Sequence, residues 1–411
     1  MRILFVDEEL PWPLTSGKRI RTYHLVQALA KFHHIGYVFY HSGPGESPSE
    51  LPGVTNIDLY PVAGRSTARL ARYLHGVENL FSSLPFSVSS HHTQRYQQRV
   101  TELIDVFEPN VIVVEWTPYA QFVQNLGGIP VVLATHNVEA RILRRHAEVK
   151  SGVAARYFAI QANRMEKFER AALADARAYT AVSSSDAAEL ESFETSTPGV
   201  VIDNGVNLDT FQAGYYSSGP PLKLSFVGSM DWMPNIDAVS YFLEEIWPLV
   251  TEARADAEFV VIGRNPPSKI LDAVARLERV TATGTVDDVR PHVQGTTVNV
   301  VPLRVGGGSR LKILEALACG LPVVTTTVGL EGLELQDRQD VWVADSAKEF
   351  AEAVLQIAEN VQLATELATS GRRSVEARYG WDAIGARYRK FLETLPQTNE
   401  QSNVANGRAV P

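Results

Sequence analysis

Three consecutive glycines followed by a charged helix are the strongest chemical signal in the sequence. The segment PLRVGGGSRLKILEALACGLPVVTTTVGLEGL (302–333) is typical of a strand, a glycine turn and a helix that begins near Ser309. Glycines let a ligand approach the backbone closely, and the first turn of a helix directs unpaired N–H groups toward it. Because helix N-termini favour anions, Gly307, Gly308 and Ser309 are candidates for a diphosphate cradle.

Two side chains of this helix add charges of opposite sign. Lys312 and Glu315 are three residues apart and share a helix face, whereas Leu314 and Leu317 turn toward the core. A cation and a carboxylate near a helix start suit a ligand that carries both phosphate and sugar hydroxyls. A glycine turn followed by a solvated Lys–Glu pair explains the same spacing equally well, and both interpretations stay open at this point.

These residues need a scaffold, and the hydrophobic pattern predicts one. Short β-branched runs alternate with longer helical stretches, as in parallel sheets covered on both faces. The predicted strands are 2–7, 34–40, 56–60, 111–115, 131–135, 178–182, 222–228, 257–263, 297–301 and 322–326. The predicted helices are 19–31, 66–80, 92–107, 138–174, 184–193, 236–253, 267–277, 309–318 and 347–359. We therefore predict an α/β protein with two doubly wound, Rossmann-like domains whose sheets face an interdomain cleft.

A segment rich in Gly, Ser and Pro separates the two series of strands. Residues 209–221, DTFQAGYYSSGPP, suit a linker or hinge better than a packed element. We expect an N-terminal domain over 1–208 and a C-terminal domain over 222–378. A C-terminal helix over 379–395 that packs back on the N-terminal domain and a disordered tail over 396–411 complete the predicted organisation.

Composition excludes several classes of function. The 411 residues carry 38 Lys and Arg against 47 Asp and Glu, a net charge of -9 that disfavours nucleic-acid binding. The only cysteine, Cys319, allows no intramolecular disulfide and no cysteine-based zinc site. The sequence has no D-x-D triad, H-E-x-x-H or Walker A motif, so we expect no metal. With no long apolar run and an acidic start after six residues, we expect a cytoplasmic protein without a secretory signal.

The helix that follows the glycines resembles a known ligand-binding motif. ILEALACGLPVV (313–324) resembles the donor-binding segment of GT-B glycosyltransferases, specifically the retaining group 1 or family 4 type. The resemblance implies that Glu315 is the second glutamate of the family's E-x7-E motif and binds the nucleotide ribose. The first glutamate would fall at Gly307, so the resemblance leaves its contact with the donor sugar to the backbone amides of Gly307, Gly308 and Ser309.

The same resemblance assigns the charges that hold the diphosphate. The family usually draws Arg and Lys from the loop after the first strand of the second domain, but FVGSMDWMPNIDAV (226–239) has neither. The role therefore moves to Arg310 and Lys312, which become predicted catalytic residues, as in a subgroup of the family.

Two further loops of the second domain match the family's donor site. Gly228 and Val286, the latter in TGTVDDV (283–289), are predicted to contact the donor. Asn235 and Asp237 are better explained as caps of the helix that follows.

The first domain offers matching residues after its first strand. In PLTSGKRIRTYHLVQALA (13–30), Gly17 and Lys18 stand where the family often has two glycines near the donor. We expect Arg19 or Arg21 to face the acceptor.

A second loop of the first domain carries a candidate histidine. THNVEARIL (135–143) resembles the family's His loop, which implies a catalytic His136 at the carboxyl end of the sheet and Glu139 on the acceptor side. A lone histidine more often has a structural role than a catalytic one, and only the resemblance favours the catalytic role for His136. The adjacent pair His91 and His92 points in two directions on any regular element and is a poor ligand set.

Taken with the resemblance, these residues imply retaining transfer of a sugar from a UDP- or GDP-sugar to a hydroxyl of a glycan, lipid-linked or small-molecule acceptor. No metal or other cofactor is expected. Two alternatives stay open: a sugar-nucleotide epimerase on the same fold, and a nucleotide-sugar-binding homologue without activity.

Two basic clusters suggest peripheral contact with the inner face of a membrane. They consist of Arg65, Arg69 and Arg72, and of Arg141, Arg144 and Arg145. A solvated helix face is the commoner explanation for both.

Overall fold

The computed structural model of the protein describes residues 1–41, 48–64, 78–79, 82–124, 126, 128–149, 151–305 and 310–395. These residues form two compact units, one of Met1–Asp203 with the chain from Gly385 onward, the other of Asn204–Ile384. Each unit has its own parallel sheet and its own hydrophobic core. The predicted α/β class with two doubly wound domains is confirmed.

The boundary between the units differs from the predicted one. It lies between Asp203 and Asn204, whereas residues 209–221 belong to the second unit. Within that segment the backbone N–H of Tyr215 donates to the carbonyl oxygen of Cys319 at 3.3 Å. Gly, Ser and Pro mark irregular backbone, but they do not distinguish a linker from a packed loop.

The first unit is built on a parallel sheet with the strand order β3-β2-β1-β4-β5-β6-β7. Ile3, Leu4, Phe5 and Val6 of the central strand are fully buried, as expected where both faces of a sheet are covered. The chain order reverses between β1 and β4, and ligands of such sheets bind beyond the carboxyl ends of the strands at this reversal. The strands are β1 (Arg2–Val6), β2 (His34–His41), β3 (Ile57–Ala63), β4 (Val111–Val114), β5 (Val131–Ala134), β6 (Ala178–Ala181) and β7 (Gly199–Val201).

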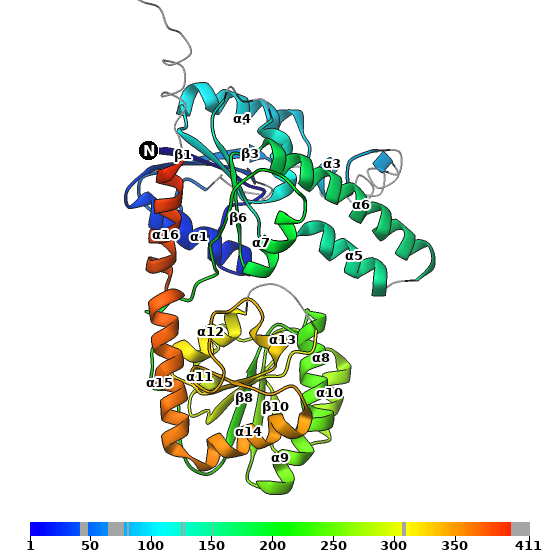
Figure 1. Ribbon diagram of the computed structural model, residues 1–411, viewed down its shortest axis with the longest axis vertical. Helices are drawn as coiled ribbons and strands as arrows, with labels where there is room; N and C mark the ends of the chain where they lie inside the picture. The colour runs from blue at the N-terminus through cyan, green and yellow to red at the C-terminus, as the bar shows by residue number, and fades with distance from the viewer. Residues whose placement is uncertain are drawn as a thin grey trace, which may run out of the picture. The chain divides into compact units, whose positions relative to one another are not determined.

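Helices connect these strands. Ser16 caps α1, and its side chain accepts a hydrogen bond from the backbone N–H of Arg19 at 3.3 Å. The helix predicted over 138–174 is divided into α5 and α6, which run side by side (Figure 1), and Gly152 at their junction has φ of 62°. Most of the predicted helix 66–80 lies outside the described residues. The helices are α1 (Gly17–Ala30), α3 (Phe86–Ser89), α4 (Gln94–Phe107), η1 (Thr117–Phe122), α5 (Glu139–Val149), α6 (Gly152–Asp175) and α7 (Ser184–Glu191).

The second unit repeats this plan with the strand order β10-β9-β8-β11-β12-β13. Its chain order reverses between β8 and β11, so a second switch point lies at the carboxyl ends of these strands. The strands are β8 (Lys223–Val227), β9 (Glu258–Ile262), β10 (Val280–Ala282), β11 (Val298–Val301), β12 (Val323–Thr325) and β13 (Trp342–Val343). The helices are α8 (Met233–Tyr241), η2 (Phe242–Ile246), α9 (Trp247–Ala253), α10 (Ser268–Ala275), α11 (Arg290–Val293), α12 (Leu311–Ala318), α13 (Thr327–Leu330), α14 (Ala347–Glu359) and α15 (Val361–Arg378).

The last helix, α16 (Trp381–Thr394), begins in the second unit and continues into the first from Gly385. A Cβ atom on Gly385 would lie 2.3 Å from the Cβ of Ala28 on α1, so the absent side chain permits close helix packing. The predicted tail, 396–411, lies outside the described residues.

Two glycines bring the ends of β8 and β9 together. The N–H of Gly228 donates to the carbonyl oxygen of Ile262 at 2.9 Å. A Cβ atom on Gly263 would lie only 1.9 Å from the carbonyl oxygen of Gly228. The loop after β8 therefore follows its observed path only with glycine at position 263.

We expect Gly263→Ala to destabilise the protein by about 1–3 kcal/mol, because the new methyl group must displace backbone. Denaturant-induced unfolding measures the change. Gly17→Ala is the control, since a Cβ there would have no atom within 4 Å. A Gly263→Ala midpoint equal to that of wild type would show that this backbone approach does not constrain the loop.

Candidate functional site

A half-buried lysine lies at the switch point of the second unit. The Nζ of Lys312, from α12, donates a hydrogen bond to Oδ1 of Asn235 on α8. The same Nζ lies 4.5 Å from the ring centroid of Phe226 on β8. The amide of Asn235 is itself oriented, because its Nδ2 donates to the carbonyl oxygen of Ser229 at 2.7 Å. A Cβ on Gly228 would lie 3.0 Å from Nζ, so this glycine leaves room for the ammonium group.

The partners of Lys312 are electrically neutral. Among the described residues, no carboxylate lies within ion-pair distance of its Nζ. Burial, with repulsion from Arg310, lowers the pKa of Lys312 to about 7. Burial also raises the pKa of Glu315 to about 7, an effect that the charge of Lys312 opposes. Such a lysine gains most from an anion that enters the site.

The other residues predicted to bind the donor have surroundings that differ from those of Lys312. Arg310 is buried, donates to the carbonyl oxygen of Val328 at 2.8 Å and lies 3.6 Å from Glu331, so its guanidinium is directed toward protein groups. A direct phosphate contact by Arg310 stays a prediction. Val286 is half-buried against the hydrophobic core. The predicted residues Gly307, Gly308 and Ser309 lie outside the described residues.

Asn235 is a site residue that the sequence argument missed. The N-cap of α8 is Trp232, without a side-chain cap, so Asn235 lies in the first turn and its predicted capping role is wrong. Asp237 does not cap either, since it pairs with Arg304 at 2.7 Å. The available signal was periodicity: Asn235 stands four residues before the buried Val239 and thus on the buried face of the helix.

In the first unit, His136 is held by a buried carboxylate at the end of β4. Glu115 is fully buried, and its Oε2 accepts hydrogen bonds from Nε2 of His136 at 3.0 Å and from Oγ1 of Thr22 at 2.8 Å. Burial alone would raise the pKa of Glu115, but the hydrogen bonds from His136 and Thr22 and the charge of Arg21 lower it. The imidazole is thereby fixed in orientation at the carboxyl end of the sheet.

Unlike Lys312, whose partners are neutral, Lys18 is paired with carboxylates. Its Nζ donates to Oδ1 of Asp7 at 2.6 Å and to Oε1 of Glu8 at 2.9 Å. Although burial opposes its charge, the two carboxylates raise the pKa of Lys18. The ammonium is already paired with two anions, so a phosphate gains little from its charge.

The two arginines predicted on the acceptor side are separated by the structure. Arg19 pairs with Glu9 and stays partly exposed. Arg21 is buried and donates to the carbonyl oxygen of Asp203 at 2.7 Å. Burial leaves Arg21 no surface for an acceptor, so its predicted role is corrected to a structural one.

Trp116 contacts both Glu139 and His91. Its Nε1 donates to Oε1 of Glu139 at 3.1 Å, and burial raises the pKa of this carboxyl. The ring of His91 meets Trp116 edge-on at a centroid distance of 4.9 Å, and its Nε2 lies 3.7 Å from Glu8. His91 is thus a second residue that sequence reasoning missed, because only the tertiary fold brings it beside Glu8.

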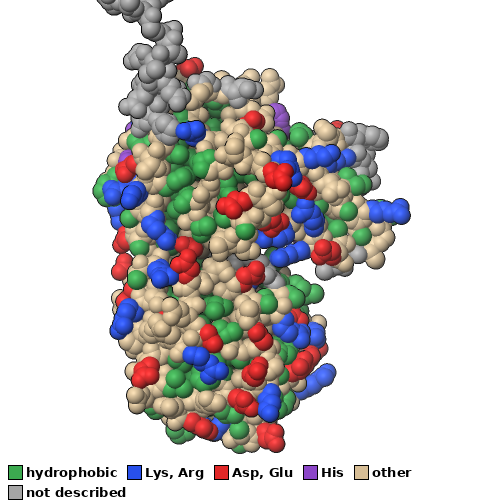
Figure 2. All heavy atoms as spheres, in the orientation of Figure 1, with side chains coloured by type: hydrophobic (Ala, Val, Ile, Leu, Met, Phe, Trp, Pro, Cys, Tyr) green, Lys and Arg blue, Asp and Glu red, His purple; other side chains and the backbone are tan. Residues whose placement is uncertain are grey.

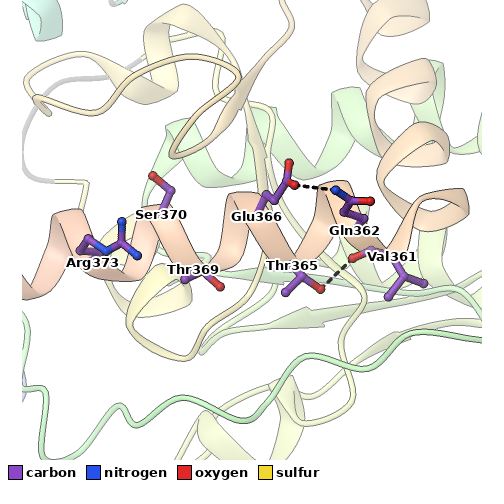
Figure 3. Close-up of a pocket in the computed structure, with 7 residues that line it drawn as sticks. All are labelled: Val361, Gln362, Thr365, Glu366, Thr369, Ser370 and Arg373. Atoms are coloured by element: carbon purple, nitrogen blue, oxygen red, sulfur yellow. Dashed lines mark hydrogen bonds between the residues drawn. The ribbon is translucent and has the colours of Figure 1, made fainter.

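The groove along α15 is not part of this site. A cavity of about 580 Å³ is lined by residues of that helix alone (Figure 3). Two of its polar side chains are bonded within the helix: Gln362 donates to Glu366 at 2.9 Å, and Thr365 donates to the carbonyl oxygen of Val361 at 2.7 Å. Ser370 donates to Asp340 at 2.8 Å. The cavity contains none of the residues predicted for the donor or the acceptor.

The described part of the predicted basic clusters is largely neutralised. Arg141 pairs with Asp186 and Glu189, and Arg144 pairs with Glu166. Figure 2 shows acidic and basic side chains interspersed over this helical hairpin. Arg65, Arg69 and Arg72 lie outside the described residues. No helix within the described ranges is long and apolar enough to cross a bilayer, and these ranges hold no group of three His, Cys, Asp or Glu suited to a metal ion.

Comparison with known proteins decides the family. A model described as Glycosyl transferases group 1 matches residues 221–360, and one described as Glycosyltransferase Family 4 matches residues 15–210. The chain belongs to the group 1, family 4 glycosyltransferases of GT-B fold. The family predicted from the sequence is confirmed.

Solved structures and curated proteins resemble this glycosyltransferase at low identity. Sucrose-phosphate synthase from Thermosynechococcus elongatus is 16% identical with a TM-score of 0.71, over 96% of this chain and 98% of that chain. HepE of Anabaena, solved with UDP and glucose, is 12% identical with a TM-score of 0.62, over 96% and 100%. A GDP-mannose-dependent phosphatidylinositol monomannoside mannosyltransferase of Corynebacterium glutamicum is 24% identical over 36% of this chain. The match spans only 42% of the length of the curated relatives.

The electrostatics of Lys312 predict that binding of a diphosphate, for which UDP is the probe, takes up protons. At about pH 8 a lysine with a pKa of about 7 is mostly neutral, and a bound diphosphate raises that pKa and recharges it. Calorimetric titration of UDP in buffers of different ionisation enthalpy measures the uptake, which should fade toward about pH 6.

Lys312→Met should abolish the uptake, whereas Lys348→Met, at an exposed lysine of α14, should leave it unchanged. Undiminished proton uptake by Lys312→Met would place the titrating group elsewhere.

Proposed function

We propose that this glycosyltransferase moves a sugar from a UDP- or GDP-sugar to an acceptor hydroxyl, with retention of anomeric configuration and without a metal. The observation that carries the proposal is the Lys312 ammonium, which is held by neutral groups at the switch point of the second unit. The described relatives support it: HepE was solved with UDP and glucose, and the mannosyltransferase of C. glutamicum is GDP-mannose-dependent.

The chemistry follows from charge on the leaving group. As the bond between the sugar and the diphosphate breaks, negative charge builds on the phosphate oxygen, and fixed donors aimed at that charge are usually the largest catalytic contribution. Lys312 supplies the nearest cation, and the buried Arg310 adds to the positive potential around it. Glu315 accepts hydrogen bonds from the ribose hydroxyls.

The first unit holds the acceptor and orients the transferring sugar. We assign no carboxylate as a covalent nucleophile, so the acceptor attacks from the face that the diphosphate leaves, and the departing phosphate oxygen takes the acceptor proton. His136, fixed by Glu115, positions the sugar. Exclusion of water protects the donor from hydrolysis. We place the reaction in polysaccharide biosynthesis on the cytoplasmic side.

The test is consumption of UDP- and GDP-sugars with and without glycan acceptors, in the presence of EDTA. We expect acceptor-dependent transfer that survives chelation. Epimerised donor without an acceptor would identify the epimerase alternative, and bound but unchanged donor would identify the binding homologue.

In the same assay, Glu315→Gln should raise the donor KM about tenfold or more while changing kcat less, because a ribose contact acts in the ground and transition states alike. Glu352→Gln, at an exposed glutamate of α14, is the control and should match wild type. An unchanged KM in folded Glu315→Gln would remove the ribose role.

A further inference from the structure

A polar cavity in the first unit lies beside the residues assigned to the acceptor side. It measures about 360 Å³, near the lower end of the roughly 300–1,000 Å³ typical of small-molecule sites. It lies at the carboxyl ends of β1 and β2. Its lining includes Glu8, Glu9, Trp12, Arg19, Tyr40 and His41. A cavity of this size fits one or two sugar rings rather than an extended chain.

The charges around this cavity are already balanced among themselves. Asp7, Glu8 and Glu9 follow β1 in succession, and Lys18 pairs with Asp7 and Glu8 while Arg19 pairs with Glu9. Three carboxylates thus face two cations. An entering phosphate or carboxylate would meet a net negative surface and no unpaired cation of Lys18 or Arg19.

The same groups suit hydroxyls. Carboxylate oxygens of Glu8 and Glu9 can accept hydrogen bonds beyond those from Lys18 and Arg19, and bonds to charged acceptors are the strong ones. Among the described residues, Nε2 of His41 is buried without a hydrogen-bond partner. The carboxylate oxygens of Glu8 and Glu9 can each bind a sugar hydroxyl.

Trp12 supplies the apolar part of the site. Its side chain is large and 40% exposed, although it also contacts the ring of Tyr23 at a centroid distance of 5.7 Å. A pyranose ring has an apolar C–H face and a rim of hydroxyls. The exposed indole can pack against the C–H face while the neighbouring polar groups bind the hydroxyls.

We propose that this cavity binds the acceptor, and that the acceptor presents to it a neutral sugar unit rather than a phosphorylated or uronic one. The inference rests on the proposed function and specifies its acceptor class. Selection against anions comes from Glu8 and Glu9, and affinity comes largely from Trp12.

The test is ligand-observed NMR on the full-length protein with methyl glycosides of glucose, galactose, mannose and N-acetylglucosamine, compared with glucose 6-phosphate and glucuronic acid. We expect at least one neutral glycoside to bind in the millimolar range, and both anionic sugars to bind about tenfold more weakly or not at all. Trp12→Ala should remove the binding. Glu8→Gln should reduce the difference in affinity between neutral and anionic sugars.

Glu102→Gln, an exposed acid of α4 in the same unit, should behave as wild type. UDP titration of every variant reports the donor site separately. Where UDP binding is intact, three results overturn this inference and leave the proposed function standing. They are no binding of neutral sugars, equally strong binding of anionic sugars, and undiminished sugar binding by folded Trp12→Ala. Loss of UDP binding in wild type would instead contradict the proposed function.

Discussion

The proposed donor site depends on the contact between the Lys312 ammonium and two neutral partners, the amide of Asn235 and the ring of Phe226. A half-buried cation without a carboxylate partner is unfavourable by itself, and its lowered pKa expresses that cost. The surrounding backbone makes the arrangement possible, because Gly228 leaves space for the ammonium and Gly263 lets β8 and β9 end close together. Such a site is complete only when an anion is present.

The two sheets each have a lysine nearby, and the charges around these two lysines differ. Each has a lysine side chain near the carboxyl end of its first strand in the sequence, β1 or β8. Lys18 is paired with Asp7 and Glu8, whereas Lys312 has no acidic partner among the described residues. This contrast supports the proposed division between the units, in which the second unit binds the diphosphate and the first binds hydroxyl groups.

Buried carboxylates give the first unit its fixed geometry. Glu115 holds His136, and Glu169 accepts hydrogen bonds from the backbone N–H groups of Glu139 and Ala140 at 2.8 and 3.0 Å. Burial raises the pKa of Glu169 to about 8 despite these two hydrogen bonds. The loop between β5 and α5 is therefore held both at its histidine and at the helix start that follows it.

The sequence predicted the long apolar strands because their burial leaves a β-branched pattern. The helical spacing after the glycines placed Lys312 and Glu315 on one face, and the family resemblance assigned their roles in the donor site. The sequence missed β7, β10 and β13, which are too short for a period to show. Asn235 and His91 were missed for another reason. Each contacts a partner distant in the sequence. Helical periodicity places Asn235 on the buried face of its helix, but no local pattern identifies the partner of either residue. The buried position of Arg21 depends on its contact with Asp203, which no spacing predicts.

The most direct test of the division between the units is calorimetric titration of UDP into wild type, Lys312→Met and Lys18→Met. The account predicts that Lys312→Met weakens UDP binding about tenfold or more, whereas folded Lys18→Met keeps the wild-type affinity. Equal loss in both variants, or loss in Lys18→Met alone, would contradict it.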